Sequence, residues 1–136
     1  MRGGPLPVRG VLEVNSECAA YKAAVTAELP HVVNQLRSTL GVGTVAKLAG
    51  VGETRAVNEW ARGNRSVRSP DVEGRLRLAF QLVEFISNEV SREVAARWFK
   101  QPNPALKYRT PEGVIGTQDL EDAGSNLMEA ARVLGR

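Results

Sequence analysis

Proline and glycine divide this 136-residue sequence into short segments whose apolar residues repeat at helical spacing. In the segment between Pro30 and Gly41, four apolar residues share one helical face. They are Val32, Val33, Leu36 and Leu40. No segment shows the sustained period-two alternation that is typical of a strand. The sequence therefore predicts an all-α fold of roughly six to eight helices.

The N-terminal part of the sequence divides at Ser16. Residues 1–15 are rich in Gly, Pro and Val and show no helical period, so we expect a flexible segment. Residues 16–29 are strong helix formers, and Ser16 is a candidate N-cap. Pro30 either kinks one long helix or occupies the first turn of a second helix.

Later helix boundaries follow from hydroxyl side chains, prolines and glycines. The sequence of residues 44–63 predicts two short helices separated by the Gly-Val-Gly stretch from Gly50 to Gly52. Further helices are expected to begin near Ser69, Ser91 and Thr110, since a serine or threonine is a favoured N-cap. A last helix closes the chain.

Composition makes several functional classes improbable. Cys18 and His31 are the single cysteine and histidine, which excludes a disulfide framework or a Cys/His zinc cluster within one chain. The sequence contains no phosphate-binding loop and no G-x-S-x-G motif, so we expect no enzyme, catalytic residue, metal or cofactor. No apolar run approaches ~20 residues and no signal peptide is recognised, so the expected location is the bacterial cytoplasm, without membrane contact.

Charge is distributed unevenly along the chain. The net charge is +3, but residues 1–110 hold 16 lysines and arginines against 10 acidic residues, while residues 111–136 hold 2 against 5. Such asymmetry is typical of a nucleic-acid surface on one part and another task for the tail. Chance scatter of surface charge is the alternative.

The stretch AVNEWARGNRSVRSP, residues 56–70, places a tryptophan inside a polar helix. On a helix over residues 54–62, Val57 and Trp60 share a narrow apolar face that we expect to pack against the preceding helix. The opposite face carries Arg55, Asn58, Glu59 and Arg62. Arginine reads guanine and asparagine reads adenine through paired hydrogen bonds, so this face suits a DNA major groove.

These features predict a helix-turn-helix over residues 42–63. Gly63 ends its second helix, and the loop that follows is expected to contact phosphates. The predicted DNA-binding residues are Thr54, Arg55, Asn58, Glu59, Arg62, Arg65 and Arg68. A helical hairpin with a solvated basic face remains the alternative.

Two segments resemble a known family. Residues 45–80 look like the helix-turn-helix of the Xre/lambda-repressor class, in which a small residue, a turn, Val-x-x-Trp and a glycine recur, although the turn at residues 50–53 is one residue longer here. Residues 94–135 resemble the toxin-binding domain of Xre/MbcA/ParS-type antitoxins. The matching features are Ala96, Trp98, Phe99, Pro102 to Leu106, Thr110, Pro111, Val114, Ile115 and a closing helix that ends in Gly135. From the residues alone, Pro102 to Leu106 form a structural elbow.

The resemblance implies a domain organisation and a function. It implies a helical region over residues 16–86 and a toxin-binding and dimerisation domain over residues 87–136. Family members are homodimeric type II antitoxins that occlude the active site of an NAD-degrading RES-domain toxin and bind promoter DNA. Carried onto this chain, the toxin-binding residues are Leu127, Ala131, Leu134, Gly135 and Arg136. A stand-alone helix-turn-helix regulator from a phage or mobile element is the alternative.

The last helix also has a simpler interpretation. Its apolar face, with Leu127 and Ala131, is more often protein core than partner surface. Its acidic residues, Glu121, Asp122 and Glu129, could face a basic nucleotide-binding cleft.

Overall fold

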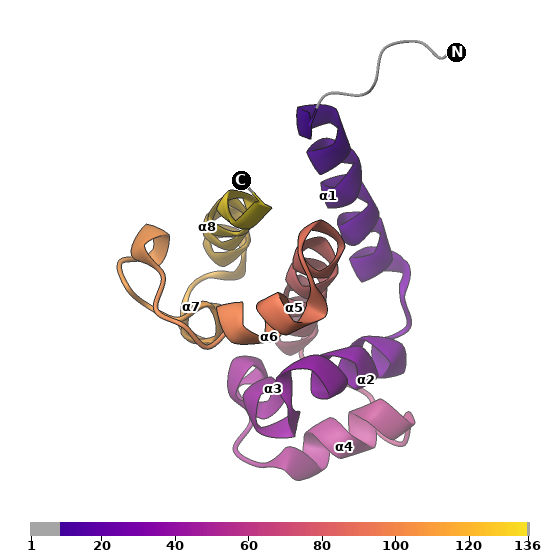
Figure 1. Ribbon diagram of the computed structural model, residues 1–136. Helices are drawn as coiled ribbons and strands as arrows, with labels where there is room; N and C mark the ends of the chain where they lie inside the picture. The colour runs from indigo at the N-terminus through magenta and orange to yellow at the C-terminus, as the bar shows by residue number, and fades with distance from the viewer. Residues whose placement is uncertain (1–8, 136) are drawn as a thin grey trace, which may run out of the picture.

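The computed structural model of the protein describes residues 9–135, and these residues are helical throughout apart from their connections (Figure 1). The α-helices are α1 (Arg9–Thr26), α2 (Leu29–Leu40), α3 (Val42–Ala49), α4 (Thr54–Arg62), α5 (Pro70–Glu89), α6 (Arg92–Trp98), α7 (Pro111–Thr117) and α8 (Leu120–Arg132). Two 3₁₀-helices are η1 (Pro104–Leu106) and η2 (Val133–Gly135). The predicted all-α fold is confirmed for this part of the chain.

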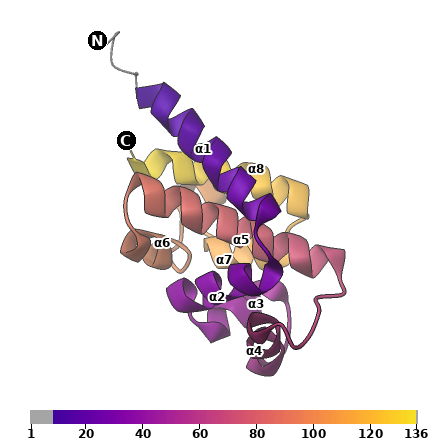
Figure 2. The same cartoon turned by 90° about the vertical axis from the view of Figure 1, so that its right-hand side faces the viewer.

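Helix α5 runs through the middle of the molecule, with α1 and α8 along it and α2 and α3 beneath it (Figure 2). Its apolar stripe is buried on several sides, because α5 contacts helices from both ends of the sequence. The large apolar side chains that α5 buries are Leu76, Leu78, Phe80, Leu82, Val83, Phe85 and Ile86. Burial of this stripe is the main hydrophobic stabilisation of the fold.

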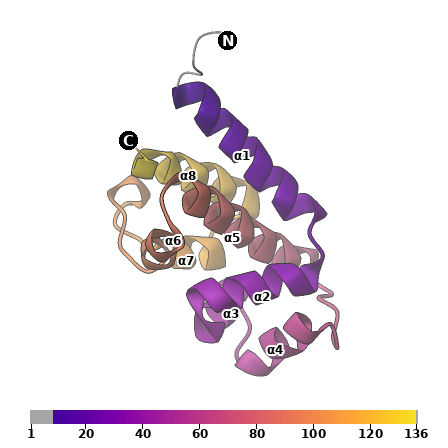
Figure 3. The ribbon, with the colours of Figure 1, turned by 45° about the vertical axis from the view of Figure 1, so that its right-hand side comes forward.

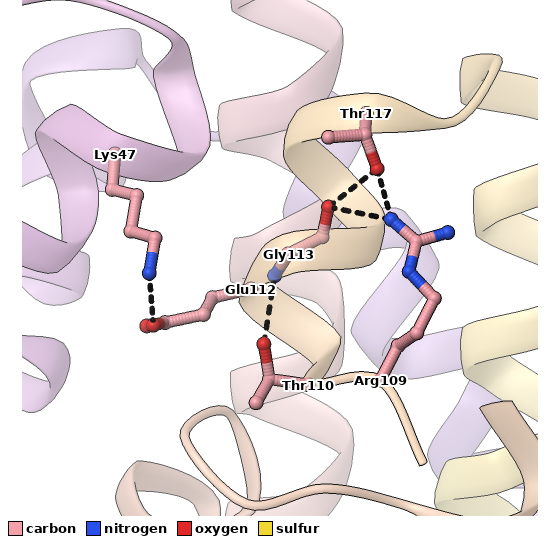
Figure 4. Close-up of polar contacts among 6 residues, drawn as sticks. All are labelled: Lys47, Arg109, Thr110, Glu112, Gly113 and Thr117. Carbon is pink, nitrogen blue, oxygen red and sulfur yellow. Dashed lines mark hydrogen bonds and ion pairs between the residues drawn. The ribbon is translucent and has the colours of Figure 1, made fainter. Parts of the chain in front are cut away.

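The two predicted regions share one hydrophobic core. Buried residues of α2 to α5 and of α6 to α8 belong to a single cluster. The boundary predicted between residues 86 and 87 falls inside α5, within this continuous packing. A polar contact also joins the two regions: Lys47 Nζ of α3 lies 3.1 Å from Glu112 Oε1 of α7 (Figure 4).

The first helix begins earlier than the sequence predicted. Helix α1 starts at Arg9, so the expectation of a flexible segment is wrong for residues 9–15, and residues 1–8 lie outside the described residues. No Gly or Pro follows Gly10 before Pro30, and valine, leucine and glutamate each differ from alanine by less than about 0.7 kcal/mol in helix propensity. Ser16 is therefore an interior helical residue, and not an N-cap.

The other boundaries follow the expected local chemistry. Pro30 lies in the first turn of α2, which decides between the two alternatives for this residue. The side-chain oxygens of Ser69, Ser91 and Thr110 each accept a hydrogen bond from the backbone N–H three residues later, at 3.1 to 3.3 Å. Figure 4 shows this cap at Thr110. Gly63 ends α4 with a φ of 76°, a left-handed conformation that favours glycine.

The apolar face of α4 is buried as the sequence predicted. Helix α4 packs against α2 and α3, and Val57 and Trp60 are 0% and 5% exposed. Three apolar residues of α3, the preceding helix, are buried in the same cluster. They are Val45, Leu48 and Ala49. The indole therefore fixes α4 on the body of the protein.

Replacing the indole should destabilise the whole domain. We expect Trp60→Ala to lower the free energy of unfolding by about 3–5 kcal/mol, because it removes a large buried side chain and leaves a cavity. Urea unfolding followed by circular dichroism measures this change. Tyr108→Ala is the matched control, since the Tyr108 side chain is 73% exposed. Equal effects of the two substitutions would contradict the assigned burial.

Candidate nucleic-acid interface

Helix α4 lies at one outer edge of the molecule. In all three views it is the lowest helix, with α2 above it, whereas the C-terminal end of α8 lies on the far side of α5 (Figures 1, 2 and 3). The side of α4 that faces away from α2 and α3 is therefore not covered by the C-terminal part of the chain. An outer edge of this kind is accessible to a macromolecular partner.

The outer face of α4 is basic. Thr54, Arg55 and Arg62 are exposed there, and the Arg55 side chain is 79% exposed. The loop that leads to α5 adds Arg65 and Arg68, which are also exposed. Five of the seven predicted DNA-binding residues thus lie on the exposed surface of α4 and its following loop.

Glu59 is the acidic member of this surface and makes two ion pairs. Its carboxylate lies 3.1 Å from Arg65 Nη1 and 3.7 Å from Arg55 Nε, so it bridges α4 and the following loop. The Glu59 side chain is 27% exposed, far less than that of either arginine. The sequence pattern placed Glu59 on the polar face but contained no signal for the pair with Arg65.

Asn58 is held against α2 by a polar network. Arg37 of α2 donates from Nη1 to Asn58 Oδ1 at 2.8 Å and from Nη2 to Asn34 Oδ1 at 3.0 Å. Asn34 in turn donates from Nδ2 to the Ala61 carbonyl at 2.8 Å. The network attaches α4 to α2 at two successive turns. Because Asn58 Oδ1 is already bonded, the geometry favours a positioning role for Asn58 over paired bonding to adenine.

Arg37 contacts this surface but was not predicted from the sequence. It lies 21 positions before Asn58, on a helix that was predicted only for its apolar face. Among the described residues its guanidinium bonds to neutral amide oxygens and makes no ion pair. This leaves a half-buried positive charge beside α4.

A concave surface follows α4. A cavity of about 660 Å³ is lined by Trp60, Val72 and the loop residues Asn64, Arg65, Ser66, Val67, Arg68 and Ser69. The Trp60 indole nitrogen is buried and has no hydrogen-bond partner among the described residues. Arg65 and Arg68 of the loop therefore line a cavity that borders the basic face of α4.

The C-terminal end buries two of its predicted toxin-binding residues. Leu127 and Ala131 are 0% and 1% exposed, so in this structure they belong to the protein core, as the simpler interpretation of the last helix expects. Helix α8 packs against α5 and α7, so a partner protein has no access to these two buried side chains. Leu134 is exposed, as is Val133, which was not predicted. Gly135 ends η2, and Arg136 lies outside the described residues.

The exposed apolar residues of this end border a second cavity. Its volume is about 460 Å³, and its lining is formed by Asn103, Pro104, Ala105, Ala130, Val133 and Leu134. The elbow predicted at residues 102–106 is confirmed: Asn103 Oδ1 accepts from the Ala105 N–H at 2.9 Å, and Leu106 is buried. The elbow thus forms one wall of an apolar hollow beside the chain end.

Helix α8 is also tied to α1. Arg132 donates from Nε and Nη2 to the two carboxylate oxygens of Glu17, at 3.0 and 2.9 Å. This hydrogen-bonded pair raises the pKa of the Arg132 guanidinium. The acidic residues Glu121, Asp122 and Glu129 remain exposed on the outer side of α8.

No protein-family model, curated protein or solved structure matches this chain, so its residues and their geometry carry the functional argument. Within residues 9–135 no helix is long and apolar enough to cross a membrane. The same part of the chain holds no group of three or more His, Cys, Asp and Glu side chains suited to a metal ion.

Proposed function

We propose that this protein binds double-stranded DNA through α4 and the loop at residues 64–69. One observation carries the proposal: a nine-residue helix buries its tryptophan against α2 and α3 and exposes arginines at the outer edge of the molecule. The major groove is about 12 Å wide and admits one α-helix, and arginine is the side chain best suited to guanine.

The basic groups fall into two sets on this proposal. Arg55 and Arg62 are on the outer face of α4, where they can meet base edges or the groove wall. Arg65 and Arg68 flank the hollow after α4, and their position suits the phosphate backbone. Asn58 and Arg37 orient α4 in this arrangement.

We further propose that the protein is an antitoxin that neutralises a RES-domain toxin and represses its own promoter. The sequence resemblance supplies the identity of the toxin. The exposed Val133 and Leu134 beside an apolar cavity support a protein-binding role for this end, since exposed apolar surface often marks an interaction site. This end lies on the far side of α5 from α4, so one molecule could hold both partners.

The same proposal includes a homodimer in the bacterial cytoplasm, because helix-turn-helix proteins commonly bind two half-sites one helical turn apart. A stand-alone regulator would use α4 in the same way but would have no toxin. A neighbouring reading frame that encodes an NAD-degrading toxin would favour the antitoxin over the stand-alone regulator.

Two arginine substitutions should separate base reading from phosphate contact. We expect Arg55→Ala to lower the preference for the selected site by about 1–3 kcal/mol, because it removes a base contact. Arg68→Ala should weaken binding to all duplexes alike, because it removes a phosphate contact. The slope of the logarithm of the binding constant against the logarithm of the salt concentration (the salt slope) should become shallower by about 1. Fluorescence anisotropy with a selected and a random duplex measures both quantities. If Arg55→Ala weakens both duplexes equally, α4 does not read bases through this residue.

Charges at the C-terminal end should abolish capture of the partner. We expect a Val133→Asp, Leu134→Asp double variant to lose copurification with the tagged product of the neighbouring reading frame, since burying unpaired carboxylates is costly. Val90→Asp is the matched control, because Val90 is an exposed valine at the end of α5. Equal capture of both variants would contradict the assigned surface.

Removal of Gly135 and Arg136 tests the terminal residues by themselves. A truncated chain that still neutralises the toxin would exclude a role of these two residues in occluding the toxin's active site. A wild-type chain that captures no neighbouring product would favour the stand-alone regulator.

A further inference from the structure

Glu59 is the one acidic residue among residues 54–62, which form α4. Its carboxylate is partly withdrawn from water and lies between two more exposed guanidinium groups. Oε1 accepts a hydrogen bond from Arg65 Nη1 at 3.1 Å, and Oε2 lies 3.7 Å from Arg55 Nε. One carboxylate therefore holds both an α4 arginine and a loop arginine.

This arrangement opposes non-specific DNA binding. Affinity without sequence preference comes from arginine and lysine charges that neutralise phosphates and release counterions. Arg55 and Arg65 are already paired with Glu59, so part of their charge is neutralised before any duplex arrives. The carboxylate itself would also approach a polyanion while losing water, which costs free energy unless a donor faces it.

A cognate site can remove that cost. The major-groove edge of cytosine presents an N4 amino group, which donates to glutamate or aspartate. A cytosine opposite Glu59 would satisfy the carboxylate and release the paired arginines toward neighbouring bases and phosphates. Guanine and thymine offer the carboxylate no donor there, and adenine presents its N6 donor beside the N7 acceptor, which would repel the carboxylate.

We propose that Glu59 is a specificity-determining residue that selects a cytosine and suppresses binding to non-cognate duplexes. The proposal rests on the DNA-binding function proposed above and adds the residue that discriminates between sites. On this proposal the Glu59 carboxylate discriminates between DNA sites, whereas the surrounding arginines supply the binding affinity.

The test compares Glu59→Gln with Glu53→Gln in the full chain. Both substitutions remove one negative charge from the same edge of the protein. Glu53 is the exposed residue that precedes α4, and its side chain makes no capping hydrogen bond. The probes are a pool of random-sequence duplexes and the duplex that the wild-type chain selects from that pool. Binding is measured by fluorescence anisotropy between about 50 and 200 mM salt.

We expect Glu59→Gln to bind the random pool several-fold more tightly than the wild-type chain does. Its salt slope should steepen by about 0.9 for each arginine released to a phosphate. Selection with this variant should lose the preference for cytosine at one position. Glu53→Gln should leave the slope and the selected sequence unchanged. Circular dichroism confirms that both variants keep the helical fold.

Two results would overturn the inference in different ways. In the first, the wild-type chain selects a site, but the two substitutions change the affinity for the random pool and the salt slope equally. Glu59 then acts only through net charge, and the DNA-binding proposal stands without a special role for Glu59. If the wild-type chain binds no duplex even at the lowest salt, the DNA-binding proposal fails and the role of Glu59 fails with it.

Discussion

Burial of the Trp60 indole, together with Val57, is the interaction on which the position of α4, and with it the candidate interface, depends. A nine-residue helix is too short to be stable by itself in water, so α4 exists because its apolar face is packed against α2 and α3. Hydrogen bonds from α2 also orient α4, since Arg37 donates to the Asn58 side chain and Asn34 donates to the Ala61 carbonyl. The basic side then faces outward as a consequence of what is buried.

The long helix α5 connects this edge to the other end of the molecule. It contacts α1, α2 and α3 as well as α6, α7 and α8, so both regions share one core. The pair between Lys47 and Glu112 adds a polar connection between α3 and α7 (Figure 4). The basic outer face of α4 and the exposed apolar residues of the C-terminal end therefore lie on opposite sides of one core (Figures 1 and 3).

Local chemistry determined what could be predicted from the sequence. The starts of α5, α6 and α7 were predictable, because Ser69, Ser91 and Thr110 act within three residues of their own position. The start of α1 was not, since nothing in its first turn resembles a cap. The roles of Asn58 and Leu127 depend on helices far away in the sequence. Helical spacing predicts which face of a helix a polar residue occupies, but it does not predict the residue that will bond to it from another helix. The contact between Arg37 and Asn58 was therefore not predicted. The same limit applies to Glu59, whose partner Arg65 lies beyond the end of α4.

The central claim is that α4 presents its outer face to a duplex while its tryptophan stays buried. Nitrogen-15 NMR of the labelled full chain during titration with the selected duplex tests it residue by residue. The account predicts amide shift changes concentrated in residues 53–69, with the Trp60 indole signal retained in its buried environment and α8 unaffected. Changes concentrated in α8, or no changes in α4 under conditions where the duplex binds, would contradict it.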